Sequence, residues 1–280
     1  MSTVVPPPPA ARKAPPPAAR APQQPETLSA SRFAISRGKI KGAQRIMLYG
    51  PGGIGKTSLA ALAPNPVFID LEDGSKDLDV ARVEWGETWA DFRACLQSSA
   101  LDSYQSIVID SVTKAESLAI AHTLATVLHP DKGYRVDSIE GYGFGKGLQF
   151  VFETFTRVLP DLDRHIRAGR NIILIAHDCV NDVPNPNGED FIRYEPHLQS
   201  PKSGKSSIRE AVFQWVDHAL FMGYDVVVGK DGKGKGGGTR TIWSAELPSH
   251  RAKSRSMAES IPYETADDGT IWQMIFGGEK

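Results

Sequence analysis

The spacing of apolar residues divides the chain into predicted strands and helices. Short apolar runs that end at Gly, Pro or Asp predict buried strands, and longer segments with apolar residues three or four positions apart predict helices. The predicted strands lie at residues 45–49, 66–71, 105–110 and 171–176, and the predicted helices at 56–63, 88–100, 113–128 and 148–168. This alternation predicts an α/β fold with a mainly parallel sheet that helices cover on both faces.

The alternation ends after residue 176. Residues 177–209 are polar and contain four prolines, so they predict a long connecting loop, which in a compact domain is usually functional or disordered. Strand-like runs follow at 218–228, 240–245 and 270–276, and the Gly/Lys tract at 229–238 predicts the tip of a hairpin. We therefore expect antiparallel strands toward the C-terminus.

The first 41 residues differ in composition from the rest of the chain. Nine of the 20 prolines fall in the first 25 residues, and residues 1–42 carry seven Lys or Arg against one acid, Glu26. Such a segment cannot bury enough apolar surface to offset its ordering entropy. We expect a disordered Pro/Ala-rich basic arm at 1–41 and one domain at 42–280; the alternative reading of the arm is a transit peptide.

Composition excludes several classes of protein. The longest apolar run is the five residues 172–176, whereas a membrane span needs about 20. Two cysteines, Cys95 and Cys179, are too few for a disulfide scaffold and agree with a reducing compartment such as the cytoplasm. The net charge of −1 is lower than nucleic-acid binders usually carry, so any such role must come from local basic patches.

A glycine-rich motif follows the first predicted strand and precedes the first predicted helix. The string GPGGIGKT at residues 50–57 matches the phosphate-binding P-loop, in which glycines let backbone N–H groups turn toward phosphate oxygens. Lys56 can reach the β- and γ-phosphates, and the Thr57 hydroxyl can ligate Mg²⁺. The candidate nucleotide-binding residues are Gly50, Pro51, Gly52, Gly53, Ile54, Gly55, Lys56, Thr57 and Ser58. The alternative is a glycine-rich turn without a ligand.

Carboxylates at the ends of two predicted strands can complete this site. Asp110 closes the apolar run at 107–110 and is the candidate Mg²⁺-associated acid, or else a cap for the following helix. Glu72 lies just past the strand at 66–71 and is the candidate base for an attacking water. Asp70 or Asp73 could serve beside it as a helper or as a cap.

These motifs, in this order, resemble a known family. The P-loop, the FIDLE string at 68–72, the VIDS string at 108–111, a glycine-rich segment before a long helix and a late basic motif resemble the RecA-type recombinase core over residues 43–276. More narrowly, they resemble the short RecA-like proteins of bacteriophages, the phage AAA-like ATP-binding group of single-strand annealing proteins. The resemblance implies a RecA-like P-loop core that uses ATP and Mg²⁺.

The resemblance also implies roles for residues outside the P-loop. Glu72 would be the catalytic glutamate, acting beside Lys56, and His177 would sense the γ-phosphate at a position where RecA itself has glutamine. A structural histidine at the end of a strand is the alternative. Lys253 and Arg255 would reach the γ-phosphate bound to a neighbouring subunit. The subunit-docking motif Phe-x-x-Ala is not matched at Phe33.

Two segments would correspond to DNA-contacting loops. The first, residues 140–147, offers Tyr142 and Phe144 for stacking on bases and Lys146 as a charge. The second, residues 177–209, offers four cations for phosphate contacts. These are Arg193, Lys202, Lys205 and Arg209. A lid over the nucleotide and solvated surface charge are the respective alternatives.

The implied function is an Mg-ATP-dependent, single-stranded DNA-binding ATPase of phage homologous recombination or single-strand annealing. It would assemble with itself into a ring or filament, act in the host cytoplasm, and have a phage single-strand-binding or replication protein as a further partner. The alternatives are an AAA-type ATPase that remodels protein or DNA, a small-molecule P-loop kinase, and a scaffold that does not hydrolyse nucleotide. Trp215, Trp243 and Trp272 are expected in the core or an interface, not as base-stacking groups.

Overall fold

The computed structural model describes residues 37–38, 42–84, 86–228, 234–257 and 260–277. The chain divides into two units, residues 1–40 and 41–280. All but two residues of the predicted arm, together with Phe33 and the start of the Gly/Lys tract at 229–233, lie outside the described residues. The description that follows is of the second unit.

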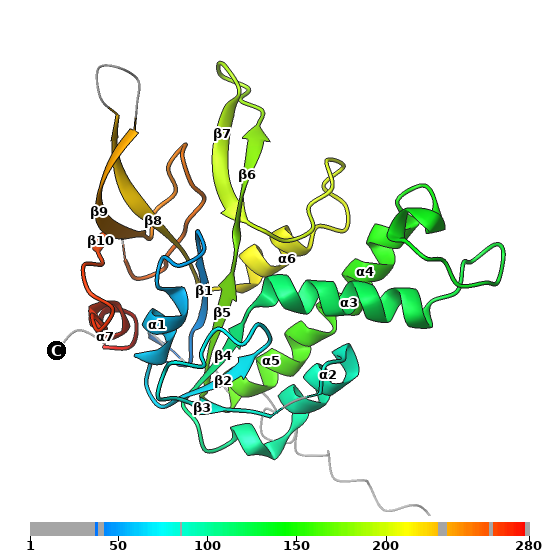
Figure 1. Ribbon diagram of the computed structural model, residues 1–280, viewed down its shortest axis with the longest axis horizontal. Helices are drawn as coiled ribbons and strands as arrows, with labels where there is room; N and C mark the ends of the chain where they lie inside the picture. The colour runs from blue at the N-terminus through cyan, green and yellow to red at the C-terminus, as the bar shows by residue number, and fades with distance from the viewer. Residues whose placement is uncertain (1–36, 39–41, 85, 229–233, 258–259, 278–280) are drawn as a thin grey trace, which may run out of the picture. The chain divides into compact units, whose positions relative to one another are not determined.

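The unit is built around an eight-stranded sheet whose strand order is β10-β9-β8-β1-β5-β4-β2-β3 (Figure 1). The strands from β3 to β8 in this order pair in parallel, and β9 and β10 are antiparallel. The strands are β1 (Arg45–Tyr49), β2 (Pro66–Asp70), β3 (Ala81–Arg82), β4 (Ser106–Asp110), β5 (Asn171–Ala176), β8 (His218–Val228), β9 (Gly234–Trp243) and β10 (Ile261–Pro262). The predicted fold class is confirmed, including the antiparallel strands toward the C-terminus.

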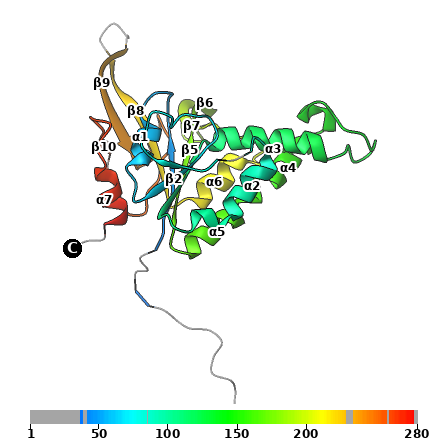
Figure 2. The same cartoon turned by 60° about the horizontal axis from the view of Figure 1, so that its bottom comes forward.

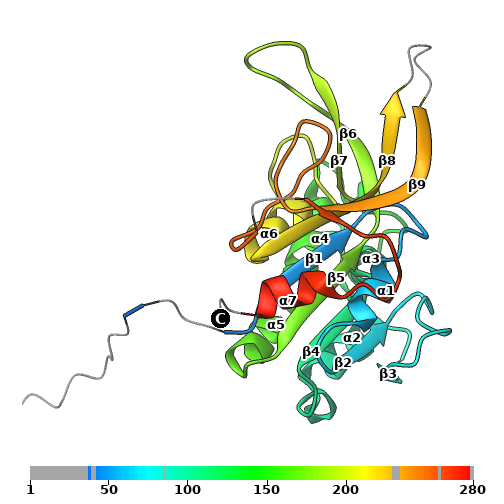
Figure 3. The ribbon, with the colours of Figure 1, turned by 90° about the vertical axis from the view of Figure 1, so that its left-hand side faces the viewer.

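Helices cover both faces of the sheet (Figures 2 and 3). They are α1 (Lys56–Ala61), α2 (Trp89–Gln97), α3 (Val112–Thr126), α4 (Lys146–Thr156), α5 (Val158–Arg167), α6 (Ile208–Trp215) and α7 (Thr270–Phe276), with the 3₁₀ turns η1 (Ser99–Leu101) and η2 (Ile139–Tyr142). α1 and α7 pack on one face, and α2 to α6 on the other. No helix among the described residues is long and apolar enough to cross a membrane.

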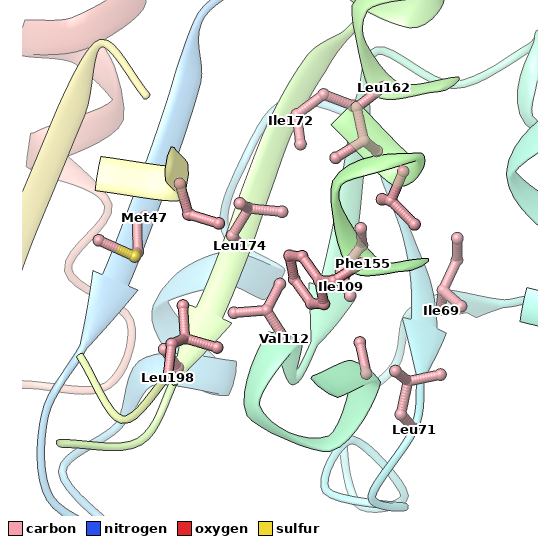
Figure 4. Packing of buried hydrophobic residues seen from close by; sticks show 14 of the residues in the cluster. Met47, Ile69, Leu71, Ile109, Val112, Phe155, Leu162, Ile172, Leu174 and Leu198 are labelled. Atoms are coloured by element: carbon pink, nitrogen blue, oxygen red, sulfur yellow. The ribbon is translucent and has the colours of Figure 1, made fainter. Parts of the chain in front are cut away.

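Successive residues of the central strands point to opposite faces and so feed two cores. Met47, Ile109 and Leu174 pack with Phe155 on the α2–α6 side (Figure 4). Their strand neighbours, such as Ile173, pack against α1 and α7 instead. This burial on both faces explains why the strands have continuous apolar runs rather than alternating ones.

The long helix predicted at 148–168 is wrong, because the structure has two helices there. α4 ends at Thr156 and α5 begins at Val158, with a break at Arg157. Pro160 has no N–H to donate to the carbonyl of Thr156, four residues earlier, so a continuous helix would lose that hydrogen bond.

The strand predicted at 270–276 is also wrong, because α7 occupies this segment. Ile271, Trp272 and Ile275 are buried against the α1 side, at a spacing that suits a helix. The Trp272 indole donates to the carbonyl of Leu59 at 2.8 Å, which fixes α7 to the end of α1.

The segment predicted as a long loop contains a second, two-stranded sheet. β6 (Asp178–Val183) and β7 (Phe191–Pro196) pair in antiparallel fashion from Asp178 opposite Pro196 to Val183 opposite Phe191. The hairpin starts directly after β5 and extends beyond the carboxyl edge of the large sheet (Figure 1). The sequence does not reveal it because both of its faces carry polar residues.

Candidate nucleotide site

The P-loop lies at the turn from β1 to α1, at the carboxyl edge of the sheet. Two of its glycines are required by the backbone path. Gly55 has a φ of 107°, which side chains other than glycine rarely adopt. A Cβ at Gly50 would overlap the carbonyl oxygen of Met222 on β8. The loop is therefore packed against the neighbouring strand at its first residue.

Lys56 lies across the loop. Its Nζ donates to the carbonyls of Gly50 at 2.7 Å and Pro51 at 2.8 Å. Burial lowers the pKa of Lys56, while the nearby carboxylates, Asp110 foremost, act in the opposite direction. An ammonium held this way is placed to exchange carbonyl partners for phosphate oxygens.

Two residues far away in sequence hold the loop from outside. Arg240 on β9 donates from Nη1 to the carbonyl of Ile54 at 3.0 Å, and the Tyr263 hydroxyl donates to the carbonyl of Gly55 at 3.5 Å. The guanidinium of Arg240 also lies 4.5 Å from the centre of the Tyr263 ring. When the N–H groups of a P-loop point inward to phosphate, the carbonyl groups of the same loop point outward. Arg240 and Tyr263 donate to two of these carbonyls and so support the loop conformation. Sequence reasoning missed both residues, and no local pattern marks them.

The metal-binding pair predicted from the sequence comes together in the structure. Thr57 Oγ1 donates to Asp110 Oδ2 at 2.6 Å. Burial raises the pKa of Asp110 to about 6, with further contributions from Asp70 and Glu72. A Cβ at position 74 would stand 3.7 Å from Asp110 Oδ2, so the glycine at this position keeps the space beside that oxygen open.

This donor set fits Mg²⁺. It consists of one hydroxyl and one carboxylate, which are hard oxygen ligands. The part of the chain that the structure describes holds no group of three or more His, Cys, Asp or Glu that could bind a metal without help. Mg²⁺ commonly completes its shell with phosphate oxygens and water, so the two protein ligands suffice.

Glu72 is held between residues of two neighbouring strand ends. Its Oε1 accepts from the Ser111 hydroxyl at 2.7 Å, and His177 Nε2 lies 3.0 Å from its Oε2. The His177 backbone N–H donates to Thr113 Oγ1 at 3.1 Å, which ties the end of β5 to the start of α3. The candidate base and the candidate sensor are thus in direct contact.

Asp70, predicted as a helper or cap, has a different environment from Glu72. It accepts from the backbone N–H groups of Glu72, Gly74 and Ser75 and from the Ser75 hydroxyl. Burial acts to raise the pKa of Asp70, but these hydrogen bonds outweigh it and the net shift is downward. Asp70 therefore organises the loop that presents Glu72.

Comparison with known proteins agrees with this geometry. A family model described as an AAA domain matches residues 42–256, which is most of the chain. The chain belongs to the AAA domain family. Its P-loop and acid pair thus lie in an ATPase domain, as the sequence predicted.

Individual relatives are more distant. The AAA domain is similar to the SPbeta prophage-derived uncharacterized protein YorG of Bacillus subtilis (strain 168), with 25% identity over 138 residues. That match covers 47% of this chain and 40% of YorG, so it spans less than half of either protein. Among solved structures, the KaiC-like protein PH0186 of Pyrococcus horikoshii OT3 aligns with a TM-score of 0.44 and 14% identity, covering 81% of this chain and 88% of that chain.

The basic residues near the C-terminus of the AAA domain lie away from its own P-loop. Lys253 pairs through its backbone with Ala219, and Arg255 contacts Asp217 at 3.3 Å. Asp217 is level with Arg45 at the amino-terminal end of β1, and Ala219 is level with Met47 in the middle of that strand. The P-loop follows the opposite end of β1. In this structure Lys253 and Arg255 do not approach the phosphate site of their own chain.

The first candidate DNA segment is partly exposed. Phe144 is fully exposed, and Lys146 forms a surface ion pair with Asp131 at 3.0 Å. The prediction for Tyr142 is wrong in this conformation, because the side chain is buried. Its hydroxyl donates to the carbonyls of Thr123 at 3.2 Å and Val127 at 2.8 Å, so the ring anchors η2 to α3.

The second segment also differs from expectation. Arg209 is buried in an ion pair with Glu195, and Arg193 pairs with Glu195 and with Glu246. Neither arginine is available to a DNA phosphate in this arrangement, because Arg209 is buried and Arg193 is held by two carboxylates. Lys202 and Lys205 are exposed, as a phosphate contact requires.

The charge of the β6–β7 hairpin is a further finding. Residues 178–196 contain five acids and one base, Arg193. The acids are Asp178, Asp182, Glu189, Asp190 and Glu195. An acidic hairpin repels a phosphate backbone, so contacts with nucleic acid are not expected along it.

The tryptophans are packed against apolar residues. Trp272 is buried in the core, and Trp215 and Trp243 are partly buried against the core beneath α2–α6. The prediction that they serve packing is confirmed for the three positions.

Proposed function

We propose that the protein is an Mg-ATP-dependent ATPase that binds single-stranded DNA and acts in phage homologous recombination or single-strand annealing. The observation that carries the proposal is the contact between Glu72 and His177. This contact joins Glu72, which would activate water, to His177, which directly precedes the β6–β7 hairpin. The prophage origin of the relative YorG supports the phage context.

The chemistry proposed for Glu72 is general-base catalysis. One carboxylate oxygen takes a proton from water as the water oxygen bonds to the γ-phosphorus, and the bond from that phosphorus to the β–γ bridging oxygen breaks. Ser111 fixes Oε1 of Glu72 at 2.7 Å and His177 Nε2 lies 3.0 Å from Oε2, and these two contacts would orient the carboxylate for the attacking water. Because His177 contacts this carboxylate, its ring would link the presence of a bound γ-phosphate to the position of Glu72.

Nucleotide binding would use groups that are already oriented. The P-loop amides and the Lys56 ammonium would bind the phosphates, while Thr57 and Asp110 would hold Mg²⁺. When bound, Mg²⁺ supplies positive charge that neutralises the β- and γ-phosphate oxygens.

A second copy of the chain would complete the site. The partners of Lys253 and Arg255 lie three and five strand residues, or roughly 10 and 16 Å, before the level of Gly50 in their own P-loop. Lys253 and Arg255 are better placed to serve a neighbour, where a cation near the γ-phosphate would stabilise charge in the transition state. This arrangement makes hydrolysis depend on assembly.

Single-stranded DNA would bind at exposed positions of the two candidate segments. Phe144 offers an aromatic face without neighbours to cover it, and Lys202 and Lys205 are exposed cations. Stacking of one base on such a ring is worth about 1–3 kcal/mol. ATP would favour the DNA-binding arrangement through His177, and hydrolysis would release the strand.

A specific observation favours a second candidate, an AAA-type ATPase that remodels protein. The β6–β7 hairpin is acidic, and Val180, Ile192 and Tyr194 are exposed on it. A surface of acids and exposed apolar side chains suits a basic protein partner better than DNA. The small-molecule kinase stays a prediction that no feature of the site favours.

DNA binding is tested by fluorescence anisotropy of a labelled oligo-dT in Mg-ATP, across a salt series. Changing Lys202→Ala and Lys205→Ala together should weaken binding and reduce the log–log salt slope by up to about 1.4, since each single-strand phosphate contact contributes about 0.7. Arg167→Ala is the matched control, because Arg167 is an exposed cation at the end of α5. Equal slopes for both variants, or no binding by the wild type, would reject the DNA role.

A further inference from the structure

The β6–β7 hairpin presents one exposed face. Directly opposite residues of two paired strands lie on the same face, as do residues two positions apart along a strand. Val180 is opposite Tyr194 and Asp182 is opposite Ile192, so these four side chains share a face. Val180, Ile192 and Tyr194 are 54%, 66% and 41% exposed. We call the side of the hairpin formed by these four residues the hairpin face.

The other face holds the hairpin on the body of the domain. Glu195 forms an ion pair with Arg209 of α6, and Asn181 Nδ2 donates to Glu195 at 3.1 Å. Arg193 reaches Glu246, in the segment after β9, at 2.6 Å. Because these polar contacts fix the hairpin from behind, the hairpin face is held outward, beyond the carboxyl edge of the large sheet (Figures 1 and 3).

The outer edge of β7 is covered by the chain itself. The Tyr194 N–H donates to the carbonyl of Ser249 at 2.9 Å, and the Arg251 N–H donates to the carbonyl of Tyr194 at 3.1 Å. The backbone groups of Tyr194 thus point away from β6. In an antiparallel pair, the residue opposite such a position also points its N–H and C=O away from the partner strand. The backbone groups of Val180, and of Asp182 two residues on, therefore face outward along β6.

The outer edge of β6 is open. Among the described residues, the small sheet consists of β6 and β7 alone. Within the same part of the chain, no group bonds to the N–H or C=O of Val180 or Asp182. A row of unpaired backbone groups is a template for a strand from another chain. A two-stranded sheet is also only marginally stable by itself, so it gains from a third strand.

The charges along this edge select the strand that pairs there. Asp182 lies on the hairpin face, and Glu189 and Asp190 lie in the turn between β6 and β7. The ion pairs of the hairpin all involve Glu195 or Arg193, so these three acids have no cationic partner among the described residues. A segment that carries Lys or Arg would supply the missing cations.

The same charges disfavour two other occupants. Antiparallel pairing of β6 with a second copy about Val180 would place Asp178 opposite the second copy's Asp182, and like charges directly opposite destabilise a sheet. Single-stranded DNA would bring its phosphates to the acids of the hairpin. Acids on an edge strand protect it from self-association and leave it open to a segment of opposite charge.

We propose that the outer edge of β6 binds an extended basic segment of another protein as a third strand of this sheet. Main-chain hydrogen bonds to Val180 and Asp182 supply affinity, and cations beside Asp182 and the turn acids supply specificity. The inference goes beyond the proposed function, because neither the nucleotide nor DNA is placed at this edge. The edge begins one residue after His177, so a bound partner would lie next to the candidate γ-phosphate sensor.

Peptide binding to the full chain tests the proposal. The probe is a fluorescein-labelled peptide of alternating Lys and Val, about seven residues long, followed by fluorescence anisotropy. Val180→Pro removes an outward N–H but leaves the β6–β7 hydrogen bonds, since Val180 donates none to β7. This variant should bind the peptide at least tenfold more weakly than the wild type. Val180→Thr is the matched control, because it keeps the N–H and the β-branched shape, and its affinity should stay within about threefold.

The charge of the edge is tested with the same probe. Asp182→Asn should weaken peptide binding severalfold and reduce its dependence on salt, because one attraction to the Lys side chains is lost. Asp137→Asn is the matched control, since Asp137 is an exposed acid outside the hairpin. That variant should bind the peptide like the wild type.

Amide hydrogen exchange measured by NMR shows whether the peptide adds as a strand. Saturating peptide should slow exchange at Val180 and Asp182 by at least tenfold. The Asn181 amide, which faces β7, should be protected with and without the peptide. The same protection of Asn181 in Val180→Pro shows that the hairpin of that variant is intact.

Several outcomes would overturn the proposal. These are failure of the peptide to bind, equal binding by Val180→Pro and the wild type, and unchanged exchange at Val180 and Asp182. Protection of these two amides before any peptide is added means that copies of the chain already cover the edge, and protection by oligo-dT means that the edge binds nucleic acid; either result rejects it. Loss of ATP hydrolysis or of DNA binding while peptide binding persists rejects the proposed function alone.

Discussion

Asp110, the candidate Mg²⁺ ligand, should reduce the stability of the protein when no metal is bound. Asp110 is buried, and its pKa is raised from an ordinary value of 3.8 to about 6, mainly because burial disfavours the charged form. The opposing attraction of Lys56 and the hydrogen bond from Thr57 are already part of that shift. Replacing the carboxylate by an amide, Asp110→Asn, should therefore stabilise the metal-free protein.

The size of the effect follows from the shift. A difference of about two pKa units corresponds to about 3 kcal/mol, which is the upper limit for the gain at pH 7.5. The ionised form exists in the native state only above pH 6, so the cost is complete above about pH 6 and vanishes only below about pH 4. For a domain of this size the gain would raise the melting temperature by about 2–10 °C.

The assay is thermal unfolding without Mg²⁺ at pH 7.5 and pH 4.5. Asp110→Asn should melt higher than the wild type at pH 7.5, and the difference should fall to about a third at pH 4.5, where the carboxyl is protonated in the folded state but still mostly ionised in the unfolded state. Asp73→Asn is the control, because Asp73 is an exposed acid of the same site and pairs only with Lys76 at the surface. A melting temperature for Asp110→Asn that is lowered at pH 7.5, or raised equally at both pH values, would refute the reasoning.

Three further variants test other parts of the site. Glu72→Gln should lower kcat for ATP by roughly 10²–10⁴-fold and leave ATP binding unchanged, and a drop under tenfold would reject Glu72 as the base. Arg240→Gln should raise KM for ATP by about tenfold or more and leave kcat nearly unchanged. In Arg240→Lys the KM should lie between those of Arg240→Gln and the wild type, and an unchanged KM in Arg240→Gln would show that the P-loop does not need the support from β9. Gly50→Ala should lower the free energy of unfolding in urea by more than about 2 kcal/mol, because the new Cβ would overlap Met222. Gly52→Ala is the control, because a Cβ there meets open space and should not lower the free energy. Equal losses in the two variants would show that the loop is not packed against β8 at Gly50.

The elements that sequence patterns predicted best are those with a continuous apolar run. β1, β5 and β8 have the predicted boundaries. For β1 and β5, burial on both faces of the sheet means that the apolar run can only be a central strand. The run at 270–276 has the same appearance but is a helix. Whether these five apolar residues form a strand or a helix depends on the neighbour available, which here is α1.

The site was predictable where chemistry is local. The P-loop, Asp110 and Glu72 follow from motifs and strand ends, and the structure brings them together with His177. Arg240 was not predictable, because its contact with Ile54 spans 186 residues and depends on how β9 lies beside the loop.

The glycine-rich segment at 140–147 shows why mobility is hard to infer from composition. Its glycines suggested a flexible loop that presents aromatic side chains. Gly147 instead packs against Ile139, where a Cβ would overlap the backbone carbonyl, and Tyr142 is buried beside α3. Phe144, between two glycines of positive φ, is the aromatic residue of this segment that stays exposed.

The central claim is that single-stranded DNA stimulates ATP hydrolysis by this protein. The direct measurement is steady-state ATP hydrolysis in Mg²⁺ at low salt, with and without oligo-dT, for the wild type and Glu72→Gln. We predict hydrolysis by the wild type that DNA stimulates severalfold, a stimulation that high salt removes, and almost no hydrolysis by Glu72→Gln. Wild-type hydrolysis that is indifferent to DNA at low salt would contradict the DNA role and favour the protein-remodelling ATPase.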